Sequence, residues 1–218
     1  MVHPEPRGQV AYNVINVVNV IDASESSRGN DVLHELSDGW FLKDVVSTGR
    51  LRCINDGNNI YRIINLLPTS FWVEHFLSES CTGFDLHFVY DFPAEVASGL
   101  IQRWKEMDPR RQPQKTFARM SMRNVNPYEF TEFDVDSADP LLRQKIDRIV
   151  ADVSHRGVLD EYAEIQTRIE YIEHPVYPSC RIYAVFLGRG ETKRETGETI
   201  RWTKEDWFSK ASCTLLIE

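Results

Sequence analysis

The sequence has no run of about eighteen consecutive apolar residues, and its first residues lack a basic stretch followed by an apolar one. The first absence argues against a membrane-spanning helix, and the second argues against a secretory signal. An Asn-x-Ser/Thr glycosylation acceptor is also missing, which agrees with an intracellular site. We therefore expect a cytoplasmic protein with no membrane partner.

Cysteine is scarce, and its spacing excludes the local zinc motifs. The chain has four widely separated cysteines, without a C-x-x-C pair and without a histidine at zinc-ligand spacing. We predict buried free thiols, because cysteine packs as a small apolar residue. The alternative is that some of the thiols link chains once the protein leaves the reducing cytosol. These candidates for contacts between chains are Cys53, Cys81, Cys180 and Cys213.

The motifs of nucleophilic catalysis are missing as well. The sequence has no G-x-S-x-G turn to present a serine nucleophile. His75 and Cys81 are close in sequence, and a Cys–His pair stays open because such partners meet only in space. The neighbours of His75 include Phe71 and Phe76, which favours a packed histidine over a catalytic one.

Metal and nucleotide motifs are incomplete. Asp134, Asp136 and Asp139 have the spacing of calcium ligands, but the central glycine and the distal glutamate of a calcium loop are absent. We interpret them as a strand end followed by a helix cap. The glycines at 188 and 190 precede no predicted helix, so they do not form a phosphate-binding turn. We predict no metal site, no cofactor and no enzymatic activity.

The formal net charge is −8, which disfavours nucleic acid as a partner. One stretch is nevertheless basic, and two interpretations of it stay open. It is either a solvated face that pairs with acidic neighbours or a phosphate or nucleotide site of an enzyme domain, in which Arg110, Arg111 and Lys115 would contact the phosphate. The cations of this stretch are Arg103, Lys105, Arg110, Arg111, Lys115, Arg119 and Arg123.

A hydrophobic content of 42% and the absence of a linker predict one domain over residues 1–218. Alternating or β-branched runs predict strands at 9–21, 84–90, 116–122, 181–187 and 213–217, and a hairpin at 51–66. Capping signals and apolar stripes predict helices at 93–107, 140–154 and 203–208. Irregular alternation of strands and helices favours an α+β fold, with a mainly antiparallel β-sheet or sandwich core and three to four covering helices.

One further helix is expected at 158–172. Val158, Tyr162, Ile165, Ile169 and Ile172 alternate steps of four and three residues, which is the spacing of a seam that packs against one partner helix.

The segment EYAEIQTRIEYIEHPVYP, residues 161–178, resembles a late helix in the polyhedrins of insect cypoviruses. The similarity lies in Tyr162-Ala163-Glu164-Ile165, in Tyr171-Ile172 and in Tyr177-Pro178. The resemblance implies an occlusion-body protein with an antiparallel β core, trimers and a lattice that dissolves in alkali.

These observations favour a non-enzymatic, self-assembling structural protein of viral origin, whose partners are its own copies and virion proteins. Two alternatives stay open. One is the phosphate- or nucleotide-binding enzyme domain that uses residues 103–123, and the other is a viral matrix-like or regulatory module that binds proteins.

Overall fold

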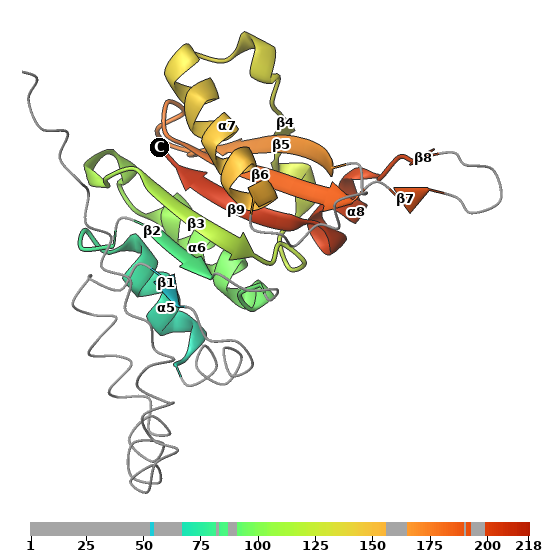
Figure 1. The fold of residues 1–218 in the computed structure, drawn as a ribbon. Helices are drawn as coiled ribbons and strands as arrows, with labels where there is room; N and C mark the ends of the chain where they lie inside the picture. Colours follow the sequence, from blue (N-terminus) through green and yellow to red (C-terminus); the bar gives the residue numbers. More distant parts are fainter. Residues whose placement is uncertain are drawn as a thin grey trace, which may run out of the picture.

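A seven-stranded mixed sheet organises the computed structural model of the chain (Figure 1). The structure describes residues 53–54, 67–81, 83–86, 91–155, 165–189, 191–192 and 199–218. The strands lie in the order β1-β2-β3-β9-β6-β5-β4. Their bounds are β1 (Cys53–Ile54), β2 (Gly83–Leu86), β3 (Lys115–Met120), β4 (Thr131–Glu132), β5 (Ile165–Glu173), β6 (Arg181–Arg189) and β9 (Ser212–Ile217). A separate ribbon pairs β7 (Glu191–Thr192) with β8 (Thr199–Ile200).

The sheet is mainly antiparallel, with parallel pairing at one end. β1, β2 and β3 are parallel to one another, whereas β3, β9, β6, β5 and β4 pair antiparallel in turn. The α-helices of the described residues are α5 (Thr69–Leu77), α6 (Ala94–Glu106), α7 (Pro140–His155) and α8 (Lys204–Lys210). Short 3-10 helices are η1 (Pro109–Arg111), η2 (Pro127–Glu129) and η3 (Val135–Ser137). The α+β class and the mainly antiparallel sheet with three to four helices are therefore confirmed.

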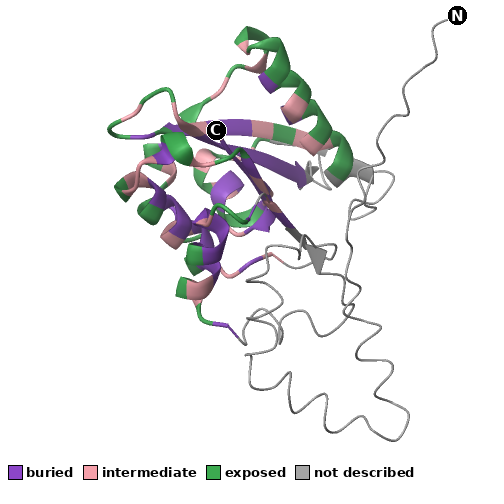
Figure 2. Cartoon of the chain, turned by 90° about the vertical axis from the view of Figure 1, so that its left-hand side faces the viewer, coloured by how far each residue is buried: buried purple, intermediate pink, exposed green. Residues whose placement is uncertain are grey.

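Helices cover both faces of the sheet, so the fold has three layers. Along β6, Ile182, Ala184 and Phe186 belong to the core shared with α5, α6 and α8. The alternate residues of β6, Tyr183 and Val185 among them, pack against α7 on the opposite face. Figure 2 shows the buried residues on the sheet and on the inward sides of the helices. The central strands are therefore apolar on both faces.

Helices with local start signals lie where the sequence predicts them. The side chain of Asp139 accepts a hydrogen bond from the amide of Leu141 at the start of α7. Thr203 and Asp206 form a reciprocal capping box at the start of α8. The apolar stripe expected on α6 is buried, and its members are Val96, Ala97, Leu100, Ile101 and Trp104.

The helix expected at 158–172 is wrong over its described part, because Ile165–Glu173 is strand β5. β5 pairs antiparallel with β6 along its whole length. Ile169 packs on the α7 face of the sheet, and Ile172 packs on the opposite face. Buried isoleucines three residues apart therefore suit a strand that is covered on both sides. The segment that resembles a polyhedrin helix is therefore a strand and its following turn from residue 165 onward.

The strands expected at 116–122, 181–187 and 213–217 are confirmed as β3, β6 and β9, and the strand at 84–90 is confirmed over its described part as β2. The strand expected at 9–21 lies outside the described residues, as does the hairpin at 51–66 apart from β1. Helix α5 was not expected, because its nine residues are largely apolar and its N-cap is Pro68, which provides no side-chain cap.

Candidate functional site

A buried carboxylate lies between two cations in the described structure. Glu170 of β5 is 0% exposed, and its two carboxylate oxygens face two different cations. The Nε atom of Arg168 lies 2.7 Å from Oε1, and the Nζ atom of Lys204 lies 2.9 Å from Oε2. Strand geometry places Arg168 and Glu170 on one face of β5, because alternate residues share a face. Lys204 reaches them from the first position of α8.

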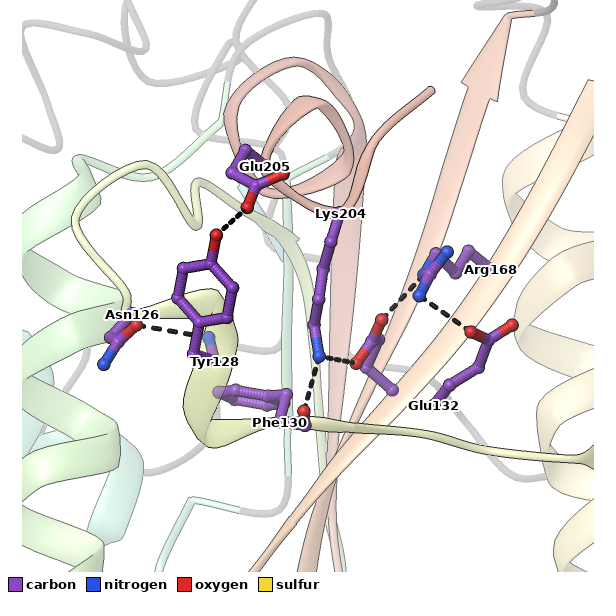
Figure 3. A network of polar contacts seen from close by, with 8 residues as sticks. Asn126, Tyr128, Phe130, Glu132, Arg168, Lys204 and Glu205 are labelled. Atoms are coloured by element: carbon purple, nitrogen blue, oxygen red, sulfur yellow. Dashed lines mark hydrogen bonds and ion pairs between the residues drawn. The ribbon is translucent and has the colours of Figure 1, made fainter. Parts of the chain in front are cut away.

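Arg168 and Lys204 make further contacts that connect β4, β5 and α8. Lys204 also donates to the carbonyl oxygen of Phe130 at 2.5 Å, and Arg168 also donates to the carboxylate of Glu132 in β4 at 2.9 Å. Figure 3 shows the side chains of Lys204, Arg168 and Glu132 between α8 and the strands. We call Glu132, Arg168, Glu170 and Lys204 the charged network. A buried charge requires such partners, so the network ties β4, β5 and α8 together.

The loop before β4 is attached to α8 by a second contact. The hydroxyl of Tyr128 donates to the carboxylate of Glu205, although the tyrosine is 76% exposed. This hydrogen bond raises the pKa of Tyr128 and lowers the pKa of Glu205. The amide of Tyr128 in turn donates to the side chain of Asn126 at 3.1 Å (Figure 3). The loop is therefore fixed beside the charged network.

Strand β5 extends beyond its neighbour β4, and within the described residues its first part has no strand beside it on that side. β4 pairs only with Glu170 and Tyr171, and the amide of Phe133 adds one bond to the carbonyl of Ile169 at 2.9 Å. Because backbone groups of an antiparallel strand alternate in direction, those of residues 165 and 167 point the same way as those of Ile169. No strand in the described ranges pairs with residues 165–168 on that side. We call this backbone stretch, residues 165–168, the β5 edge.

The basic stretch does not assemble the three residues of the expected phosphate site. Lys115 is 1% exposed, and its Nζ donates to the carbonyls of Phe76 and Ser78 at the end of α5. Arg110 instead makes two side-chain hydrogen bonds to the carboxylate of Asp108, and Arg111 is exposed on the same 3-10 helix. Burial lowers the pKa of Lys115, whose ammonium acts as a cap for helix carbonyls.

Two other cations of the basic stretch pair with acidic neighbours, and a third bonds the backbone, whereas Arg119 is buried. Arg103 pairs with Glu106, and Lys105 pairs with Glu129. The Nε of Arg123 donates to the carbonyl of Ser209 at 3.0 Å. The Arg103–Glu106 pair is exposed and contributes little stability, as the solvated-face interpretation expects.

A histidine that the sequence did not single out fastens the β5–β6 turn to α6. His174 Nδ1 accepts hydrogen bonds from the amides of Val176 and Tyr177, both at 3.2 Å. Its Nε2 must then carry the proton, and it lies 3.1 Å from the carbonyl oxygen of Trp104. The guanidinium of Arg110 stacks 4.1 Å from the centre of the Tyr177 ring. Arg110 is therefore an exposed residue that contacts this turn from η1.

The cysteines differ in how deeply their side chains are buried. Cys81 and Cys213 are buried, as predicted for packed thiols. Burial raises the pKa of Cys213 well above its ordinary value. Cys180 is free and half-buried, and Cys53 lies in β1. All four cysteines stay predicted candidates for a link between chains, and Cys180 is less buried than Cys81 and Cys213.

The carboxylates tested as metal ligands act as local caps. Asp134 accepts from the amide of Asp136, and Asp139 accepts from that of Leu141, in agreement with the cap interpretation. Within the described residues, no group of three or more His, Cys, Asp and Glu side chains is arranged to hold a metal ion. The same part of the chain contains no helix that is long and apolar enough to cross a membrane.

Comparisons of the chain with models of protein families, with curated proteins and with solved structures found no match.

Proposed function

We propose that this protein is a non-enzymatic structural protein that assembles with its own copies in the cytoplasm. The β5 edge is the observation that carries this proposal. An unpaired strand edge presents backbone donors and acceptors in a row, which is a template for pairing with another chain. Pairing at such an edge needs no pocket, metal or catalytic group.

The charged network supports the proposal because it holds the edge in place. Arg168 belongs both to the β5 edge and to the network, and the buried Glu170 binds it from the next position on the same face. A preorganised edge loses less conformational entropy when it pairs than a mobile one does. The network therefore suits a strand that is built to receive a partner.

Exposed apolar side chains contribute less to the argument. Tyr128, Leu141 and Val176 are the large apolar residues that are most exposed in the described structure. Single apolar residues on a surface are ordinary, so these three do not define a contact by themselves.

An occlusion-body protein of viral origin is the more specific form of the proposal, and virion proteins are its further partners. It rests on the short resemblance at 161–178. Alkaline dissolution of the assembled protein is the property that separates this form from other self-assembling proteins.

Light scattering of the full chain over a wide range of concentrations tests the proposal. We expect the mass per particle to exceed that of the 25.3 kDa chain and to rise with concentration. A mass that stays at one chain at the highest concentration would refute self-assembly.

A further inference from the structure

We propose that the β5 edge pairs antiparallel with the β5 edge of a second copy, about a two-fold axis that passes beside Gln166. The inference rests on the proposed self-assembly and adds the interface and its register. Such an interface is isologous, because the same residues contribute from both copies.

The backbone directions support this register. The amide of Phe133 donates to the carbonyl of Ile169, so the backbone groups of Ile169 point toward β4. Because these directions alternate along a strand, the N–H and C=O groups of residues 165 and 167 point the same way, outward from the sheet. With Gln166 at the axis, Ile165 of each copy lies opposite Thr167 of the other, and each such pair exchanges backbone hydrogen bonds. The two Gln166 side chains then face each other, and each amide offers both donors and an acceptor.

The neighbouring registers are disfavoured for two different reasons. An axis at Arg168 would place two guanidinium groups opposite each other, which is destabilising. An axis at Thr167 would pair Ile165 with Ile169, whose carbonyl already accepts from Phe133. Gln166 is therefore the centre that leaves β4 in place and avoids like charges.

Charge argues that the occupant is a second copy. The chain has a net charge of −8, so most of its surface repels other copies of itself. The β5 edge is locally neutral, because Ile165, Gln166 and Thr167 are uncharged and Arg168 is bound by two carboxylates. Among the described residues of the edge a basic or acidic peptide finds no free countercharge, whereas an identical neutral strand meets no repulsion.

Disulfide trapping tests the register. Directly opposite residues in a non-hydrogen-bonded pair have Cα atoms about 4.5 Å apart, within the disulfide range, whereas diagonal residues are about 7–8 Å apart. In a background with Cys53→Ser and Cys180→Ser, Gln166→Cys should form a disulfide-linked dimer under mild oxidation. The matched control Thr167→Cys should form it at least about tenfold more slowly. Faster linkage at position 167 than at 166 would overturn the register.

A proline scan tests the edge independently of disulfide chemistry. Thr167→Pro removes an outward N–H that β6 does not use, so the sheet should persist while the edge can no longer pair. We expect light scattering to show loss of the dimer with an unchanged circular dichroism spectrum, whereas Thr167→Val should assemble as the wild type does. An assembly that tolerates Thr167→Pro and does not cross-link at Gln166→Cys would overturn this interface and leave self-assembly standing. A wild type that is strictly monomeric would overturn both.

Discussion

The neutral histidine in α5 should make folding sensitive to mild acid. His75 is 7% exposed, and its Nε2 atom has no hydrogen-bond partner in the described structure. Burial, with a smaller contribution from Lys115, holds the pKa of His75 at about 4, below its ordinary value of 6.5. Between these two values the unfolded chain binds a proton that the folded chain does not, so stability falls as the pH falls.

The size of this effect follows from the two pKa values. A difference of 2.5 pKa units, from 6.5 to about 4, corresponds to about 3 kcal/mol at 1.36 kcal/mol per unit. The contribution is fully present above pH 6.5, decreases as the pH falls and is lost by about pH 4. His75→Gln keeps a polar side chain that does not titrate. Its unfolding free energy should therefore fall by about 3 kcal/mol less than that of the wild type over this range.

Urea unfolding followed by circular dichroism measures both proteins at pH 7, 6, 5 and 4. Protein concentration must be the same throughout, because self-association makes apparent stability depend on it. Other acidic groups titrate in both proteins and cancel in the difference. Parallel curves for wild type and variant from pH 7 to pH 4 would refute the reasoning, since they would show that His75 binds its proton equally in the folded and unfolded chains.

Two further predictions concern the charged network and the assembly. Glu170→Gln should lower the free energy of unfolding by roughly 3 kcal/mol, because it leaves Lys204 without a carboxylate and Arg168 with only the exposed Glu132. The exposed Glu132→Gln, which also pairs with Arg168, should cost less than about 1 kcal/mol, and equal losses in urea unfolding would contradict the network's role. Assembled protein should dissolve between about pH 9.5 and 11, as lysines lose charge and exposed tyrosines gain it. Burial raises the pKa of Tyr183 and Cys213, so these two groups ionise late and the individual chains should stay folded. Turbidity with circular dichroism measures this, and assemblies that persist unchanged at pH 11 would contradict the occlusion-body form.

Local chemistry in the sequence was enough to predict the helices that begin with a cap. Thr203 with Asp206 and the side chain of Asp139 satisfy backbone amides within their own first turns, so no distant residue is needed to position α7 or α8. The central strands were predictable for a related reason, since their β-branched and aromatic residues favour a pleated backbone. The α+β class followed from the order of these elements.

The structure of residues 165–173 depended on tertiary packing. Isoleucines at 165, 169 and 172 have the spacing of a helix seam, but Ile169 and Ile172 pack on opposite faces of a strand that has helices on both sides. Only the position of α7 on one side and the core of α5, α6 and α8 on the other distinguishes these two solutions. The sequence alone therefore predicted the wrong element at the strand that now carries the proposed function.

The charged network and the contacts of the basic stretch also depended on tertiary structure. Glu170 and Lys204 are 34 positions apart in the sequence (204 − 170), and they meet only because α8 covers the face of β5 on which Glu170 lies. Lys115 carries a cationic group that could bind phosphate, yet in the fold its ammonium donates to carbonyls at the end of α5. Sequence by itself determined which residues carry charge and where capped helices begin. The tertiary structure decided which charges are buried together, because burial and pairing arise from contacts between elements that are distant along the chain.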